Sequence, residues 1–90
     1  MTVQDLYIKL KLLGISEDRY YLNGLYGSTS DDDRLALTIK REDYTICYET
    51  YYKERGEKHS IVKFSTENEA CQYLYKRLLE NKEIEDRYSK

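Results

Sequence analysis

Most of the fold can be read from residues 44–79, YTICYETYYKERGEKHSIVKFSTENEACQYLYKRLL. The beginning of this stretch, residues 44–53, alternates with a period of two and is rich in tyrosine, which predicts a β-strand. Glu54-Arg55-Gly56 predicts a tight turn because Gly56 accepts a positive φ, and residues 60–64 provide the returning strand. The stretch therefore begins with a β-hairpin.

A helix follows this hairpin. Thr66 and Glu69 have the spacing of a capping box, and apolar residues then recur at helical spacing as far as Leu78. The last residues, 82–90, are dominated by charge and predict a frayed tail.

Further strands are predicted on the N-terminal side. Residues 34–40 alternate as a strand and lead into a hairpin connection at residues 41–43. Residues 20–22 predict a short strand that ends at Asn23-Gly24, a pair typical of turns between strands. The sheet should therefore have three or four strands.

The chain begins with a predicted helix over residues 2–13, which Thr2 caps and Gly14 ends. Short connections between the strands favour an antiparallel meander. We therefore expect an α+β fold: one domain over residues 1–90, in two layers, with both helices on one face of the sheet and the other face in water.

The expected core combines one apolar stripe from each helix with the inward face of the sheet. Its predicted members are Leu6, Leu10, Leu37, Ile46, Phe64 and Leu74. Some tyrosines should also be buried, with their hydroxyls reaching the surface: Tyr44, Tyr48 and Tyr73.

Composition restricts the class of protein. The chain has 17 acidic and 15 basic residues, whereas a nucleic-acid-binding domain usually carries a basic excess. The N-terminus lacks a signal-peptide pattern, and no apolar run approaches the roughly 20 residues that span a bilayer. We therefore expect a cytoplasmic protein without membrane contact, in which Cys47 and Cys71 are reduced; a disulfide or redox pair is the alternative.

No residue cluster has the spacing of a catalytic, cofactor or metal site. His59 is the one histidine, and Cys47 with His59 as nucleophile and base would need a third, orienting group. The aspartates at 31–33 could bind calcium or magnesium, but they lack the EF-hand spacing. We expect no enzyme activity, cofactor or metal, and an enzyme that uses Cys47 is the weakest alternative.

The aspartate triplet is instead a candidate surface for a basic protein partner. Only Arg34 adjoins it in sequence as a neutralising charge, and clustered carboxylates speed the encounter with a basic protein. Tyr26 lies in the same loop with no obvious core to fill, and Glu49 and Tyr51 would extend the patch across the wet face of the sheet. The predicted partner-binding residues are Tyr26, Asp31, Asp32, Asp33, Glu49 and Tyr51. The alternative is that the loop only closes a turn, and that the helices bind the partner.

The 11 tyrosines leave three roles open: core packing, interface anchoring and stacking on unpaired bases. Base stacking needs a positive groove, and the basic residues of the predicted sheet are interleaved with acidic ones. We therefore expect no appreciable affinity for single-stranded RNA or DNA.

The second half of the chain resembles small bacterial immunity proteins, which are encoded beside polymorphic or contact-dependent toxins. The resemblance lies in three segments: Tyr44-x-Ile46-x-Tyr48, then Tyr52-Lys53-Glu54-Arg55-Gly56, then Phe64-Ser65-Thr66-Glu67-x-Glu69-Ala70-Cys71-x-Tyr73-Leu74. It implies a cytosolic antidote without catalysis or cofactor that blocks a cognate toxin by direct binding. Many such toxins are basic nucleases, which an acidic surface would suit.

The leading hypothesis is therefore a non-catalytic toxin-neutralising protein. The alternative is a small regulatory or nucleic-acid-associated module that uses a tyrosine-rich sheet.

Overall fold

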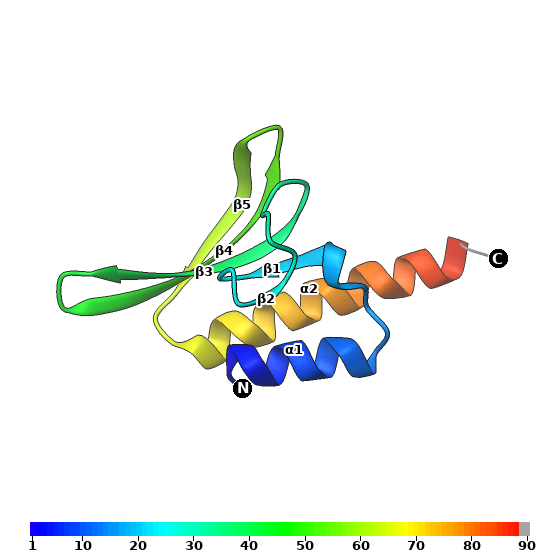
Figure 1. The fold of residues 1–90 in the computed structure, drawn as a ribbon, viewed down its shortest axis with the longest axis horizontal. Coiled ribbons are helices and arrows are strands. Elements are labelled where there is room, and N and C mark those ends of the chain that lie inside the picture. Colours follow the sequence, from blue (N-terminus) through cyan, green and yellow to red (C-terminus); the bar gives the residue numbers. More distant parts are fainter. Residues whose placement is uncertain (89–90) are drawn as a thin grey trace.

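A computed structural model describes residues 1–88. The elements in chain order are α1 (Val3–Leu12), the 3-10 turn η1 (Glu17–Arg19), β1 (Tyr20–Leu22), β2 (Tyr26–Gly27), β3 (Arg34–Glu42), β4 (Thr45–Glu54), β5 (Glu57–Phe64) and α2 (Glu67–Tyr88). Figure 1 shows α1 and α2 side by side beneath the sheet. The predicted α+β fold, with its helices at the two ends of the chain, is confirmed.

The sheet has five strands in the order β2-β1-β3-β4-β5. β1 runs parallel to β3, with Tyr20 opposite Leu35 and Leu22 opposite Leu37, and the other neighbouring strands are antiparallel. The prediction of an antiparallel meander with three or four strands is therefore wrong in the strand number and in the direction of β1.

The turn that follows β1 extends the parallel pairing with β3. Asn23 has a φ of 52° there, a conformation that asparagine tolerates. The Asn23 N–H donates to the Leu37 carbonyl at 2.7 Å, and the Asn23 Oδ1 accepts from the Ile39 N–H at 3.1 Å. Asn23 thus continues the hydrogen bonding of β1 along β3, and residues 28–33 return the chain to the start of β3.

The β3–β4 and β4–β5 hairpins follow the sequence pattern closely. β3 and β4 pair without interruption from Arg34 opposite Lys53 to Glu42 opposite Thr45. Arg55 and Gly56 have φ values of 52° and 79°, as expected of a tight two-residue hairpin turn. β5 begins before its predicted start, and its register against β4 shifts at a bulge between Thr50 and Tyr52.

The core lies between the helices and one face of the sheet. Leu6, Leu10, Leu37 and Leu74 are fully buried in it, as predicted, and Phe64 packs against it while partly buried. A domain of this size can bury one hydrophobic core, and two layers, one of helices and one of strands, are enough to enclose it.

The prediction that Ile46 and Tyr44 are buried is wrong. Ile46 is 42% exposed and Tyr44 is fully exposed. Both lie where the β3–β4 hairpin extends past the end of β5, beyond the part of the sheet that the helices cover (Figure 1). Tyr48 and Tyr73 are partly buried.

The charged end of the chain is helical, contrary to the predicted fraying. α2 continues to Tyr88, with Glu85 bound to Arg19 and Lys82 paired with Asp86 at 3.2 Å. Lys82 and Asp86 are four residues apart, and an ion pair at this spacing stabilises a helix modestly. Residues 89–90 of the predicted tail lie outside the described residues.

Neither of the two helices described combines the length and the apolar character that crossing a membrane requires.

Candidate partner-binding site

The acidic loop, residues 28–33, is held by hydrogen bonds within itself and to the sheet. The Ser28 hydroxyl accepts from the Ser30 N–H and the Ser30 hydroxyl accepts from the Asp32 N–H, both at 3.2 Å. Arg34 donates to the Ser28 hydroxyl and to the Ser30 carbonyl. The loop therefore presents its aspartates from a fixed backbone.

Asp31 is bound by two side chains of β4. The Tyr51 hydroxyl donates to Asp31 Oδ2 at 2.7 Å, and Lys53 Nζ lies 3.3 Å from Asp31 Oδ1. The hydrogen bond from Tyr51 and the charge of Lys53 hold the pKa of the Asp31 carboxyl below its ordinary value. Asp31 is thus a structural residue, because side chains of β4 bind both of its carboxylate oxygens.

Asp32 and Asp33 are the outward members of the triplet. Asp32 is exposed and lies 3.8 Å from Lys53 Nζ, a contact that is weak at the surface. Asp33 is exposed, and its N–H donates to the Lys53 carbonyl at 2.7 Å, which fixes its backbone at a φ of 58°. Arg34 adjoins the triplet in sequence, and β4 brings a second basic residue, Lys53, against it in space.

Glu49 and Tyr51 do not lie on an open surface, which corrects the expectation of a wet face at these positions. Glu49 is 4% exposed and Tyr51 is 2% exposed. Lys58 Nζ lies 2.9 Å from Glu49 Oε1 and 4.5 Å from the centre of the Tyr51 ring, and Lys40 approaches the same Glu49 oxygen at 3.6 Å. Lysine stems from both neighbouring strands therefore cover this part of the sheet.

The same contacts shift the titration of Glu49. The hydrogen bond from Lys58, together with the charges of Lys58 and Lys40, keeps the pKa of the Glu49 carboxyl below its ordinary value despite its burial. A charged Glu49 is therefore part of the folded structure, and Lys40 and Lys58 shield it from contact with a partner.

Tyr26 fills a place in the fold, so the expectation that it has no core to fill is also wrong. Its ring stacks on Tyr7 of α1, with ring centroids 4.6 Å apart and planes inclined by 18°. It packs against the buried cluster while remaining partly exposed. Tyr26 therefore holds β2 to α1, and its role in binding remains a prediction.

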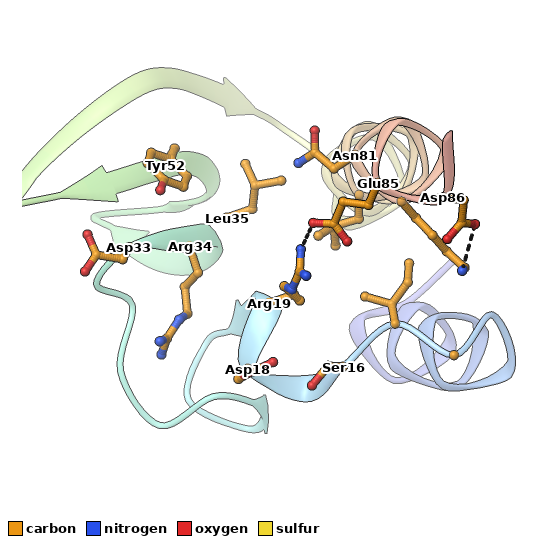
Figure 2. A pocket seen from close by; sticks show the side chains of 14 residues that line it. Ser16, Asp18, Arg19, Asp33, Arg34, Leu35, Tyr52, Asn81, Glu85 and Asp86 are labelled. Carbon is orange, nitrogen blue, oxygen red and sulfur yellow. Dashed lines mark hydrogen bonds and ion pairs between the residues drawn. The ribbon is translucent and has the colours of Figure 1, made fainter. Parts of the chain in front are cut away.

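Asp33 lines a groove of about 400 Å³ beside the acidic loop. Figure 2 shows Asp33, Leu35 and Tyr52 on the sheet side of this groove, with Asn81, Glu85 and Asp86 of α2 across it and Asp18 at its edge. Four carboxylates and three basic side chains line it: Asp18, Asp33, Glu85 and Asp86, with Arg19, Arg34 and Lys82.

Most charges of the groove are already engaged. Arg19 is bound to Glu85, Lys82 is paired with Asp86, and Arg34 is held by the loop. Asp18 and Asp33 have no ion-pair partner among residues 1–88. A hydrogen bond from Ser16 lowers the pKa of the Asp18 carboxyl. Asp18 and Asp33 are therefore the carboxylates of the groove that form no ion pair within residues 1–88, although the charges of Arg19 and Arg34 act on Asp18.

Sequence reasoning missed the contribution of Asp18, Glu85 and Asp86. They come from η1 and the far end of α2, two distant segments that the pairing of Arg19 with Glu85 joins. The available signal was the charge spacing of Lys82 and Asp86, which fits a helical i,i+4 pair and argues that the helix continues.

Residues considered for catalysis are far apart or buried. His59 lies opposite Tyr52, and along an extended strand Tyr52 is about 17 Å from Cys47, too far for a nucleophile and its base. Cys71 is buried in the core, where desolvation raises the pKa of its thiol to about 11. Both thiols are free, and residues 1–88 contain no grouping of side chains suited to hold a metal ion.

No family model, no curated protein and no solved structure matches this chain.

Proposed function

We propose that this chain is a non-catalytic protein that acts in the cytoplasm by binding and neutralising a cognate bacterial toxin. The observation that carries the proposal is the fixed acidic surface formed by Asp32 and Asp33, with Asp18 at the edge of the neighbouring groove. The resemblance of residues 44–74 to small immunity proteins gives the class of partner.

The acidic surface suits a basic partner for two physical reasons. Exposed carboxylates that are not neutralised by the fold attract cations over several ångströms and raise the rate of encounter. Their backbone is already ordered by the contacts of Ser28, Ser30 and Lys53, so binding loses little conformational entropy.

The alternative of a nucleic-acid module receives less support from the geometry. Base stacking needs exposed aromatic faces along the sheet. Tyr51 is buried under Lys58, while Tyr48 and Tyr52 pack against the core on the helix side. The tyrosines of β4 thus serve the fold, apart from Tyr44 next to its start.

The test measures association with the toxin domain encoded next to this gene, inactivated by substitution of its catalytic residue. The variant is Asp32→Asn/Asp33→Asn; Asp31 stays, because Tyr51 and Lys53 bind it. Asparagine tolerates the positive φ at position 33, so the loop should keep its shape. The proposal expects the association rate at low salt to fall roughly threefold to tenfold, and the difference to shrink at high salt.

Glu80→Gln/Glu83→Gln is the matched control, since it removes two exposed carboxylates of α2 that do not line the groove. It should leave the association rate nearly unchanged. Equal effects of the two double variants would mean that net charge alone attracts the toxin, and would remove the loop from the interface.

A further inference from the structure

One side of α1 carries apolar side chains that the fold leaves unpacked. Val3, Leu6 and Leu10 are buried in the core. At 3.6 residues per turn, Ile8 and Leu12 project from the opposite side of the helix, and they are 48% and 82% exposed. Figure 1 shows α1 along the lower edge of the molecule, with the sheet above it. Two large apolar side chains, four residues apart, therefore face away from the core.

These side chains line a shallow hollow of about 520 Å³ on the outer surface of the helices. The other residues that line it are Met1, Asp5, Lys9 and Gln72. Exposed apolar side chains that are gathered on one face and bordered by polar groups are typical of a surface that a protein partner covers.

The charged groups of this surface are separated by sign along α1. Asp5 lies in the first turn of the helix and Lys9 in the last turn. Neither forms an ion pair among residues 1–88, although the charge of Lys9 acts on Asp5, and the N-terminal ammonium is engaged by Asn68 at 2.8 Å. Two copies of α1 that cross antiparallel place Asp5 of each against Lys9 of the other. The surface is therefore complementary in charge to itself, as a two-fold symmetric interface requires.

The apolar side chains agree with the same antiparallel register. When Asp5 of one copy is level with Lys9 of the other, the two Ile8 side chains are offset by only about 3 Å along the helix axis. Leu12 is then level with residue 2 of the second copy, beside the part of the hollow that Met1 and Asp5 line. One register thus pairs the charges and covers the exposed apolar side chains together.

We infer that this chain self-associates as a two-fold symmetric dimer in which α1 packs antiparallel against α1 of a second copy. The inference does not depend on toxin binding. Because α1 has only 10 residues, the interface is smaller than the standard size, and we expect a Kd of about 10–100 μM. At the low micromolar concentrations that suit denaturation or partner-binding experiments, the protein is then mostly monomeric.

The dimer leaves the acidic loop accessible. The loop, residues 28–33, lies on the sheet side of the molecule, away from α1 (Figure 1). Both loops of a dimer therefore stay exposed. If the proposed function holds, a concentrated sample should contain complexes of two copies of this chain with two toxin domains.

The first test is sedimentation equilibrium of the full chain over about 5–500 μM. The mean mass should rise with concentration from the monomer mass of 10.8 kDa towards twice that value. Ile8→Ser should raise Kd at least about tenfold. Ile61→Ser is the matched control, because Ile61 of β5 is 49% exposed and lies on the sheet; it should change Kd less than about threefold. A mean mass that stays at the monomer value up to the highest concentration would overturn the inference.

The second test identifies the surface and the antiparallel arrangement through charge. Lys9→Glu should raise Kd at least about tenfold, whereas Lys11→Glu makes the same change of charge on another side of α1 and should have less than about a threefold effect. Equal effects of the two variants would show that another surface pairs, and would overturn the inference.

A mixture of charge variants gives the sharpest result. Asp5→Lys and Lys9→Glu should each fail to dimerise alone, because like charges then meet, and an equimolar mixture should recover association. A mixture that stays monomeric while both variants are folded would contradict the antiparallel pairing. Asp5 also accepts from the Thr2 N–H, so circular dichroism first checks that Asp5→Lys is folded; if it is not, the comparison of Lys9→Glu with Lys11→Glu decides.

Discussion

The Tyr51 hydroxyl donates a 2.7 Å hydrogen bond to the Asp31 carboxylate and thereby fastens the acidic loop to β4. Tyr51 is buried, and Lys53, on the same face of β4, binds the other oxygen of the same carboxylate. The loop that carries Asp32 and Asp33 is therefore anchored through its third acidic member. This separates the aspartates into one structural residue and two exposed ones.

Tyr51→Phe should lower the free energy of unfolding by about 1–3 kcal/mol, the cost of losing a partly buried hydrogen bond to a charged group. Urea denaturation measures it. Tyr44→Phe is the matched control, since it removes the same hydroxyl from a fully exposed ring and should change stability by less than about 0.5 kcal/mol. Similar effects at the two positions would show that the hydroxyl of Tyr51 does not hold the loop.

The pH dependence of stability should reflect Asp31 and Glu49, whose folded-state pKa values are both lowered. A carboxylate with a lowered pKa stabilises the fold above its unfolded pKa of about 4, and this stability is lost as pH falls through the folded pKa. The free energy of unfolding should therefore decrease as pH drops below about 4. Tyr51→Phe removes the largest cause of the lowered pKa at Asp31, so NMR titration should find that pKa raised towards its ordinary value. An unchanged pKa would contradict this assignment.

Leu74→Ala should destabilise the domain by about 2–5 kcal/mol, because Leu74 is fully buried between α2 and the sheet. Chemical denaturation gives the value, and Leu12→Ala on the exposed surface of α1 serves as the control. A loss below about 1 kcal/mol would mean that the core tolerates the cavity or that the helix packs on another face.

Gly27→Ala should destabilise the protein far more than Gly14→Ala. Both glycines have positive φ, 80° and 76°, so both substitutions carry a backbone cost of about 1–2 kcal/mol. A Cβ at position 27 would also lie 2.5 Å from the Tyr20 carbonyl oxygen, whereas a Cβ at position 14 meets nothing within 4 Å. The difference between the two variants in thermal denaturation isolates the clash, and equal melting temperatures would contradict the close packing of β2 on β1.

The local patterns of the sequence predicted most of the elements but not their assembly. Alternation in residues 34–40 and 44–53 identified β3 and β4, and Arg55-Gly56 identified their connection to β5. The parallel pairing of β1 with β3, which Asn23 extends by bonding to Leu37 and Ile39, is a long-range contact that no local pattern contains. A period of two likewise shows that Ile46 faces one side of a strand, but not that the helices end before reaching it.

The candidate site could be predicted only in part, because several of its contacts join residues that are far apart in the sequence. The aspartate triplet is visible in the sequence, but the separation of Asp31 from Asp32 and Asp33 depends on Tyr51 and Lys53, about 20 residues away. The burial of Glu49 depends on Lys40 and Lys58 from two other strands. Charge pairing across a sheet depends on which strands are neighbours as well as on their register, and the alternation within one strand does not give its neighbours.

The most direct test of the proposed toxin binding is isothermal titration of this chain, at physiological salt, with the product of the neighbouring gene that the proposal takes to be the toxin, in inactivated form. The account predicts a one-to-one complex with a Kd below about 1 μM, and inhibition of the active toxin at the same stoichiometry. No heat of binding at concentrations about a hundredfold higher, together with undiminished toxin activity, would contradict it.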